Sequence, residues 1–213
     1  MMKKLTVLAA AAVACLVAVP PCRAQTSTAE KRFPQLTLEQ LNGAPRALAD
    51  EILKVSSVGL GGPYNLMLRS PVMGDRLFDL LAYLRFETSL PRHLNEFAIL
   101  IQARLWTSQV VWYAHYPAAI KAGLSQSVAD ELKAGRRPSA MKPDEAVLYD
   151  LCMELSTTHA ISDATFQRAR QVFTDQQIVD VLAVSGTYVT VSMLLNAGEE
   201  PAPGGQKPLA PLP

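Results

Sequence analysis

The stretch EFAILIQARLWTSQVVWYAH holds one acid, Glu96, and one imidazole, His115, in an otherwise largely apolar and aromatic setting. Burying an ionisable side chain is costly unless it is paired or put to chemical use, so two such groups that meet there form a candidate proton-transfer pair. On one unbroken helix, their separation of nineteen positions would place them about 28 Å apart. The chain must therefore reverse direction between them.

The segment Trp106–Gln109 is the natural place for this reversal, because Ser and Thr side chains cap a new helix by accepting hydrogen bonds from its free N–H groups. The sequence thus predicts a hairpin of two helices, with Glu96 on the first and His115 on the second. Residues three or four positions apart on the second helix share one face: Ser108, Val111, Trp112, His115 and Ala119. We expect Trp112 to form an apolar wall that excludes water from His115, strengthens charge interactions there and offers a surface for a planar ligand.

The rest of the chain is also predicted to be helical. Apolar residues recur mostly at three and four positions, and uninterrupted alternation is scarce, which indicates an all-α fold. We expect one helical domain over residues 37–198, an N-terminal arm at 25–36 and a Pro/Gly-rich tail at 199–213 that cannot continue a helix. Helix starts are predicted after Ser162 and after Thr174, which forms a capping box with Gln177.

Residues 1–24 have the pattern of a secretory signal peptide. Lys3 and Lys4 precede an apolar run at 5–19, and the small-residue cleavage site Cys22-Arg23-Ala24 follows it. The apolar run is short for a membrane span, so we expect cleavage, a periplasmic or secreted protein, and no membrane attachment afterwards. The alternative is an N-terminal anchor that is retained.

Composition narrows the function classes further. Cleavage after Ala24 would leave 189 residues with 17 basic and 19 acidic side chains, a net charge of −2. That length is enough for one domain with a real core, and no basic patch suggests a nucleic-acid partner. Cys152 would be the sole remaining cysteine, so an internal disulfide is excluded and packing must supply the stability.

The spacing of Glu96 and His115, together with the residues that follow, resembles the carboxymuconolactone decarboxylase family, including its alkylhydroperoxidase D-like branch. The likeness runs from about Tyr64 to Asn196 and is strongest in the segments Pro117-Ala118-Ala119, Lys121-Ala122-Gly123-Leu124 and Gly135-Arg136-Arg137-Pro138. The resemblance implies an oligomeric, all-helical AhpD-like bundle with a central helical hairpin that carries the site.

The peroxidase branch of that family carries a C-x-x-C pair, whose positions are occupied here by Ser108 and Val111. Without sulfur there is no dithiol–disulfide cycle, so a thiol peroxidase is disfavoured. What remains by resemblance is the decarboxylase-like branch, which uses neither metal nor organic cofactor and acts on a small carboxylated lactone. His115 is then the general acid/base and Glu96 the partner that orients it.

Substrate-binding roles are predicted from position for Ser108, Trp112, Trp106 and Tyr188. For the two tryptophans, packing in the core or at an interface is the alternative. His93 and Glu96 also have the i, i+3 spacing of half a metal site, but no second carboxylate–histidine cluster completes it, so no metal is predicted.

Two further expectations concern biology rather than chemistry. The lactone decarboxylase belongs to a catabolic pathway that is normally intracellular, so export leaves the substrate open. A second hypothesis is therefore a non-catalytic exported module that binds a small molecule or an assembly partner on the same scaffold.

The apolar segment 179–196 has no continuous polar face, which indicates that it is buried on all sides. This predicts a homo-oligomer, and the alternative is that the segment is the central helix of a monomer.

Overall fold

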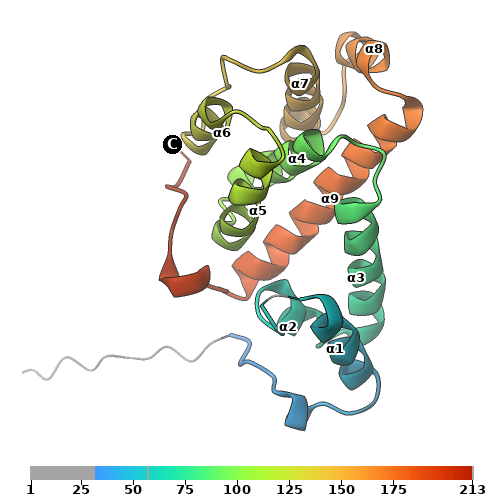
Figure 1. Ribbon diagram of the computed structural model, residues 1–213, viewed down its shortest axis with the longest axis vertical. Helices are drawn as coiled ribbons and strands as arrows, with labels where there is room; N and C mark the ends of the chain where they lie inside the picture. Colours follow the sequence, from blue (N-terminus) through green and yellow to red (C-terminus); the bar gives the residue numbers. More distant parts are fainter. Residues whose placement is uncertain (1–31, 57, 213) are drawn as a thin grey trace, which may run out of the picture. The chain divides into compact units, whose positions relative to one another are not determined.

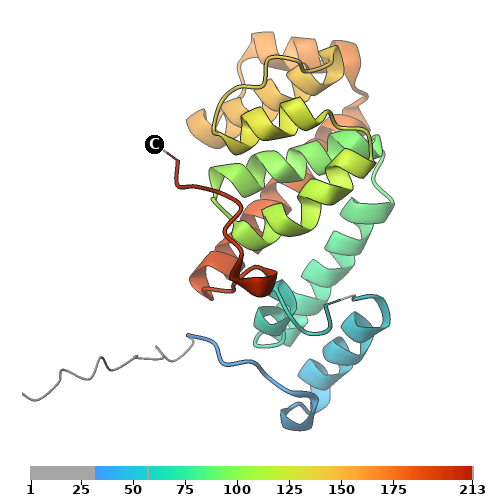
Figure 2. The same cartoon turned by 60° about the vertical axis from the view of Figure 1, so that its left-hand side comes forward.

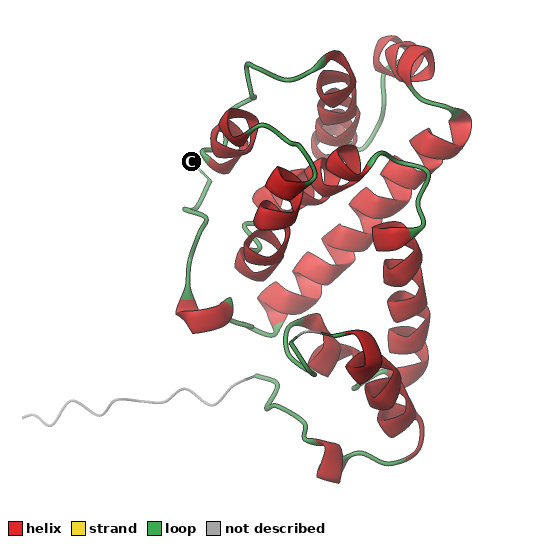
Figure 3. Cartoon of the chain, viewed as in Figure 1, coloured by secondary structure: helices red, strands yellow, loops and turns green. Residues whose placement is uncertain are grey.

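Helices form the framework of the computed structural model, which describes residues 32–56 and 58–212 (Figure 3). In chain order they are α1 (Gly43–Val55), α2 (Pro63–Met67), α3 (Pro71–Phe86), α4 (Arg92–Leu105), α5 (Gln109–Lys121), α6 (Gln126–Lys133), α7 (Pro143–Thr158), α8 (Asp163–Val172) and α9 (Asp175–Ala197), with 3-10 turns η1 (Leu38–Gln40) and η2 (Pro203–Gly205). No strand occurs among the described residues, so the all-α prediction is confirmed. The predicted signal peptide, residues 1–24, lies outside them.

Helix α4 is the central element of the bundle. It packs against α5, α6, α7 and α9 (Figures 1 and 2). Every residue from Leu94 to Arg104 is buried, as expected for a helix that has neighbours on all sides. A polar side chain in this buried part of α4 therefore lies in the core, where it needs a partner or a function.

Helices α4 and α5 form the predicted hairpin. The turn between them places Thr107 in the left-handed region at φ 47°, and the Ser108 amide donates to the Ala103 carbonyl over 2.8 Å. The shared face of α5 is buried as expected, with Ser108 and Ala119 completely inaccessible to solvent. The chain reverses at the predicted place, but the predicted side-chain cap is absent, because the Ser108 hydroxyl accepts no hydrogen bond from the first turn of α5.

Predicted helix starts also hold. The Ser162 hydroxyl accepts a hydrogen bond from the Thr165 amide at the start of α8. At the start of α9, the Thr174 hydroxyl accepts from the Gln177 amide while the Gln177 side chain accepts from the Thr174 amide. Both arrangements satisfy backbone donors that a helix leaves free at its first turn.

The long helix α9 crosses the bundle and contacts α2, α3, α4, α5, α7 and α8. By length and composition alone it is apolar enough to cross a membrane, but more than half of its most apolar window is buried against the other helices. Val179 and Met193 remain exposed at 61% and 48%. The other helices of the same chain therefore bury more than half of the most apolar part of α9 and leave some apolar side chains exposed.

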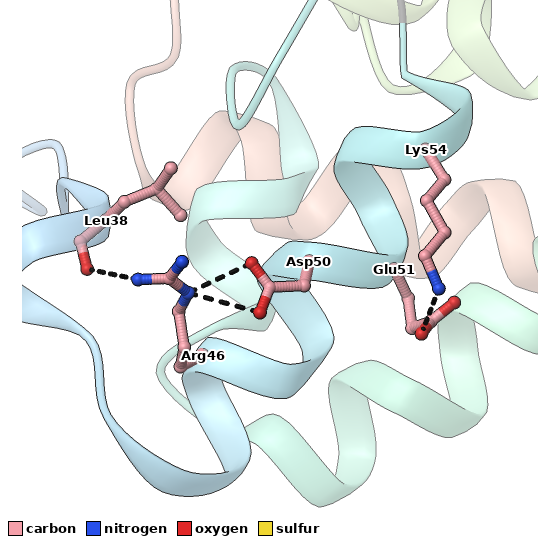
Figure 4. Close-up of polar contacts among 5 residues, drawn as sticks. All are labelled: Leu38, Arg46, Asp50, Glu51 and Lys54. Atoms are coloured by element: carbon pink, nitrogen blue, oxygen red, sulfur yellow. Dashed lines mark hydrogen bonds and ion pairs between the residues drawn. The ribbon is translucent and has the colours of Figure 1, made fainter.

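The surface of α1 shows how exposed charges support local structure (Figure 4). Arg46 Nε lies 2.9 Å from Asp50 Oδ1, and an Arg46 Nη1 atom donates to the Leu38 carbonyl, which joins η1 to α1. Lys54 pairs with Glu51 one turn along the helix. Exposed pairs of this kind contribute at most about 1 kcal/mol each, so packing holds the helix in place.

The C-terminal segment 199–212 lies against the hairpin rather than apart from the domain. The Gln109 side-chain amide donates to the Leu209 carbonyl, and the Leu209 amide donates to Gln109 Oε1, each over 2.9 Å. Leu209 joins the hydrophobic core, and Ala202 is also buried. Nothing in the sequence pattern indicated this contact, because a Pro- and Gly-rich composition ends α9 without specifying what the following segment packs against.

Candidate functional site

Glu96 and His115 meet inside the bundle. The Glu96 Oε2 atom lies 2.7 Å from His115 Nδ1, although nineteen positions separate the residues. Glu96 is 1% exposed and His115 is 8% exposed. Both belong to the same chain, so a second copy is not needed to assemble the pair. Their distance satisfies the geometric requirement for proton transfer between two side chains.

The second ring nitrogen of His115 faces a tyrosine from α9. The Tyr188 hydroxyl lies 3.1 Å from His115 Nε2, and the two rings are arranged edge to face with centroids 5.0 Å apart. An ionised Glu96 can only accept, so it takes the Nδ1–H of the imidazole. His115 Nε2 accepts from the Tyr188 O–H when the ring is neutral, and donates to the Tyr188 oxygen when the ring is protonated. We call these three side chains the Glu96–His115–Tyr188 chain.

Two arginines border this chain, and sequence reasoning did not single them out. Arg92 lies 2.7 Å from Glu96 Oε1 and donates over 2.5 Å to the Arg85 carbonyl. The guanidinium carbons of Arg85 and Arg92 lie 4.9 and 5.7 Å from the centre of the Phe86 ring. The i, i+4 spacing of Arg92 and Glu96 was the signal available in the sequence.

Ionisation of the site follows from burial and these charges. Burial opposes ionisation of Glu96, but the hydrogen bond from His115 and the charges of His115, Arg92 and Arg85 outweigh it and lower the pKa of the carboxyl group. Burial raises the pKa of the Tyr188 hydroxyl well above its ordinary range. Near neutral pH the site therefore holds a carboxylate at one end and a protonated phenol at the other.

The arrangement of helices around this site matches several solved structures. The AhpD core of a peroxidase-related protein from Ralstonia eutropha JMP134 aligns with a TM-score of 0.68 at 16% identity, over 82% of this chain and 93% of that one. A peroxidase-related protein from Silicibacter sp. TM1040 aligns with a TM-score of 0.63 at 16% identity, over 82% and 94%. A protein of unknown function from Agrobacterium tumefaciens aligns with a TM-score of 0.57 at 18% identity, over 65% and 96%.

This chain has the AhpD fold. The predicted AhpD-like helical bundle is thus confirmed, and at these identities the likeness extends to the fold alone. No protein-family model matches the sequence, and no curated protein is significantly similar to it.

Within the AhpD fold, Ser108 and Val111 stand at the start of α5, where the peroxidase branch of the resembled family carries its two cysteines. Ser108 is completely buried and its hydroxyl has no hydrogen-bond partner among the described residues. The ring nitrogens of His115 are engaged by Glu96 and Tyr188, so Ser108, Glu96 and His115 do not form a hydrolase triad.

The two tryptophans lie in different surroundings. Trp112 is 1% exposed and stacks on Tyr116, with ring centroids 5.9 Å apart. Trp106 lies in the hairpin turn, where its carbonyl accepts from the Asn196 side chain. It also lines a cavity of about 420 Å³ between the turn and the C-terminal segment, and neither Glu96 nor His115 lines that cavity.

The histidine and the cysteine that were considered for metal binding and thiol chemistry, His93 and Cys152, have partners other than Glu96 and His115. His93 faces Asp144 at 3.6 Å rather than Glu96, and no cluster of three or more His, Cys, Asp or Glu residues is found there. Cys152 is fully buried against Ser185, and burial raises the pKa of its thiol to about 11 despite the opposing hydrogen bond from Ser185. A thiol in such surroundings is a poor nucleophile.

Proposed function

We propose that this protein is an exported, cofactor-free lyase that acts on a small carboxylated lactone or a related ring acid by general acid/base catalysis. The buried Glu96–His115–Tyr188 chain carries this proposal, because it provides a route for a proton through groups held in fixed orientations. The resemblance to the carboxymuconolactone decarboxylase family supplies the substrate class. His115 is assigned as the acid/base, and Glu96 as the residue that positions it.

The proposed step begins with a bound ring carboxylate. The bond between the ring and the carboxylate breaks, CO2 leaves, and the electron pair moves into the ring as a dienolate. A proton passes from the imidazolium of His115 through the Tyr188 hydroxyl to the ring carbon, and His115 regains a proton from solvent. Ionised Glu96 stabilises the imidazolium during this cycle, while the raised pKa of Tyr188 keeps its hydroxyl protonated between turnovers.

Ser108, Trp112 and Trp106 belong to the proposal as substrate contacts. Ser108 supports it best, because its buried hydroxyl is left without a partner at the face of α5 that also carries His115. Trp112 and Trp106 have packing roles already, so their contribution to binding rests on the sequence pattern. Substituting each of the three by alanine and measuring KM separates binding from packing.

The decisive experiment measures CO2 release and loss of substrate across a panel of γ-lactone and cyclic unsaturated carboxylic acids. His115→Ala is expected to lower kcat by about 100-fold or more, as for the loss of a general acid/base. His159→Asn is the matched control, since His159 is exposed at the end of α7 and has a left-handed backbone that asparagine tolerates. Unchanged turnover in the folded His115→Ala variant would remove His115 from the mechanism.

The same panel addresses the alternative of a binding or assembly module. If the protein binds ring acids saturably but turns over none of them, the binding module is favoured over the lyase. Peroxide reduction that survives in a Cys152→Ala variant would contradict the exclusion of a peroxidase, which rests on Ser108 and Val111 at the positions of the two cysteines.

We also propose export and self-association. Export rests on the signal-peptide pattern of residues 1–24, and N-terminal sequencing of the mature protein after expression in a bacterial host tests it.

A homo-oligomer is supported by exposed apolar side chains such as Val72, Phe86 and Val179 on α3 and α9. Light scattering on the purified protein gives the number of copies.

A further inference from the structure

We propose that Arg85, held beside Arg92 and Phe86, binds the carboxylate of an anionic ligand next to the Glu96–His115–Tyr188 chain. This inference rests on the proposed function for the identity of the ligand, because both place a ring carboxylate at the same site. It adds a specificity-determining residue on α3, outside the helical hairpin that the sequence pattern identified.

The charges around the site do not balance. The ionisable groups that make up the site or whose charges act on Glu96 or Tyr188 come from five helices: Tyr64 on α2, Arg85 on α3, Arg92 and Glu96 on α4, His115 on α5 and Tyr188 on α9. Among these groups, the two guanidinium charges of Arg85 and Arg92 stand against the single carboxylate of Glu96. The site therefore favours an anion by one unit of charge.

The two arginines are not equivalent. Arg92 is committed to protein partners, because one nitrogen pairs with Glu96 at 2.7 Å and another donates to the Arg85 carbonyl. The Arg85 side chain makes no ion pair or hydrogen bond with the described residues, and its Nε is buried without a partner. An unsatisfied guanidinium donor in a partly buried position is costly, and a ligand carboxylate supplies an acceptor for it.

Phe86 restricts the orientation of the Arg85 guanidinium. The Arg85 guanidinium carbon lies 4.9 Å from the centre of the Phe86 ring, which restricts the plane of its donors. A planar guanidinium held in this way matches a carboxylate through two parallel hydrogen bonds. The charge of Arg85 also acts on both Glu96 and Tyr188, so the guanidinium lies within electrostatic range of the proton route.

Binding of a defined probe tests the inference without requiring turnover. The probe is the γ-lactone acid 5-oxotetrahydrofuran-2-carboxylate, and γ-butyrolactone, which lacks the carboxylate, is the neutral comparison. Titration calorimetry on the full-length protein is expected to show that Arg85→Met weakens binding of the acid by about 10- to 100-fold. Arg85→Lys is expected to recover part of that loss, since it restores charge without the paired donors.

Arg76→Met is the matched control, because Arg76 lies on the same helix with a side chain that is 78% exposed. It is expected to leave the affinity unchanged, and circular dichroism with thermal melting verifies that each variant folds. Equal affinity of wild type and folded Arg85→Met for the acid overturns the inference, as does an absence of binding to the wild type. A change of oligomeric state in Arg85→Met without a change in affinity also overturns it, in favour of a carboxylate from a second copy.

The outcomes separate this inference from the proposed lyase. Arg85-dependent binding of the acid without turnover of any ring acid supports the carboxylate site and rejects the lyase. Turnover that needs His115 but shows unchanged KM and affinity in Arg85→Met supports the lyase and rejects the carboxylate site.

Discussion

The imidazole of His115 and the carboxylate of Glu96 are joined by a 2.7 Å hydrogen bond between helices α5 and α4, in a part of the core that excludes almost all solvent. The pair ties the two arms of the hairpin together at the same point where the proposed chemistry takes place. Substituting different members of the Glu96–His115–Tyr188 chain therefore separates the contribution of this pair to stability from its contribution to activity.

Glu96→Gln is expected to lower the free energy of unfolding by about 1–3 kcal/mol at pH 7. Because the pKa of Glu96 is lower in the folded chain, the unfolded chain binds more protons as the pH falls. The stabilising effect is therefore complete above about pH 4.3, the ordinary pKa of glutamate, and is lost as the pH falls through the lower folded-state value. Urea denaturation between pH 7 and pH 3 should show the gap between wild type and variant closing. Glu87→Gln, at an exposed residue, is the control, and a gap that stays constant would contradict the assignment.

Tyr188→Phe removes the hydroxyl that faces His115 Nε2 while the aromatic ring stays in place. Stability should fall by only about 1 kcal/mol, the value of one hydrogen bond, whereas turnover of a ring acid should fall by about 100-fold if the proton passes through the hydroxyl. Tyr149→Phe is the control, since Tyr149 is also buried and stacks on Phe97 rather than on His115. Full activity in Tyr188→Phe would mean that His115 transfers its proton directly.

Asp180 holds the connection between α3 and α4 against α9. Its Oδ2 accepts from the Ser89 amide at 2.8 Å, from the Ser89 hydroxyl at 2.6 Å and from the Thr88 hydroxyl at 3.0 Å. Asp180→Ala is expected to cost about 2–4 kcal/mol, because it leaves several partly buried donors unsatisfied. Chemical denaturation measures this loss, with Asp79→Asn on an exposed part of α3 as the control. A loss below about 0.5 kcal/mol, as at an ordinary surface position, would show that the connection is held by packing alone.

Two helical glycines should respond to alanine in opposite directions. A Cβ at Gly74 would lie 2.6 Å from the Met67 carbonyl oxygen and 2.9 Å from Leu48 Cδ2, whereas one at Gly186 would meet nothing within 4 Å. Gly74→Ala is expected to destabilise the protein by about 1–3 kcal/mol, and Gly186→Ala to stabilise it by about 0.5–1 kcal/mol. Melting temperatures of the two variants provide the test, and shifts in the same direction would contradict the close packing of α3 on α1 and α2.

Gln109 is expected to hold the C-terminal segment against the hairpin through its paired bonds to Leu209. Gln109→Ala should therefore increase amide hydrogen exchange at residues 202–212 while exchange in α4 stays slow. Gln126→Ala, at an exposed position on α6, serves as the control. Unchanged exchange in the segment would mean that burial of Leu209 suffices to hold it.

Much of the site was predictable because it depends on local rules. A serine and a threonine between two apolar runs indicate a helix boundary, and helical periodicity then places Trp112 and His115 on one face. An acid and an imidazole in apolar surroundings must find partners, so the hairpin brings Glu96 to His115. Periodicity and capping residues likewise determine the starts of α8 and α9.

Other parts depend on contacts between segments that are distant in the sequence. Arg85 reaches the site because α3 packs against α9, and Leu209 meets Gln109 because an extended tail returns to α5. Tyr188 was named from its position, but only the packing of α9 on the hairpin aims its hydroxyl at His115 Nε2. Helical periodicity specifies which face of a helix is buried and leaves open which other helix covers it. The sequence by itself therefore determined the all-helical hairpin and its acid–imidazole pair, whereas the tertiary structure decided the tyrosine, the arginines and the tail that surround them.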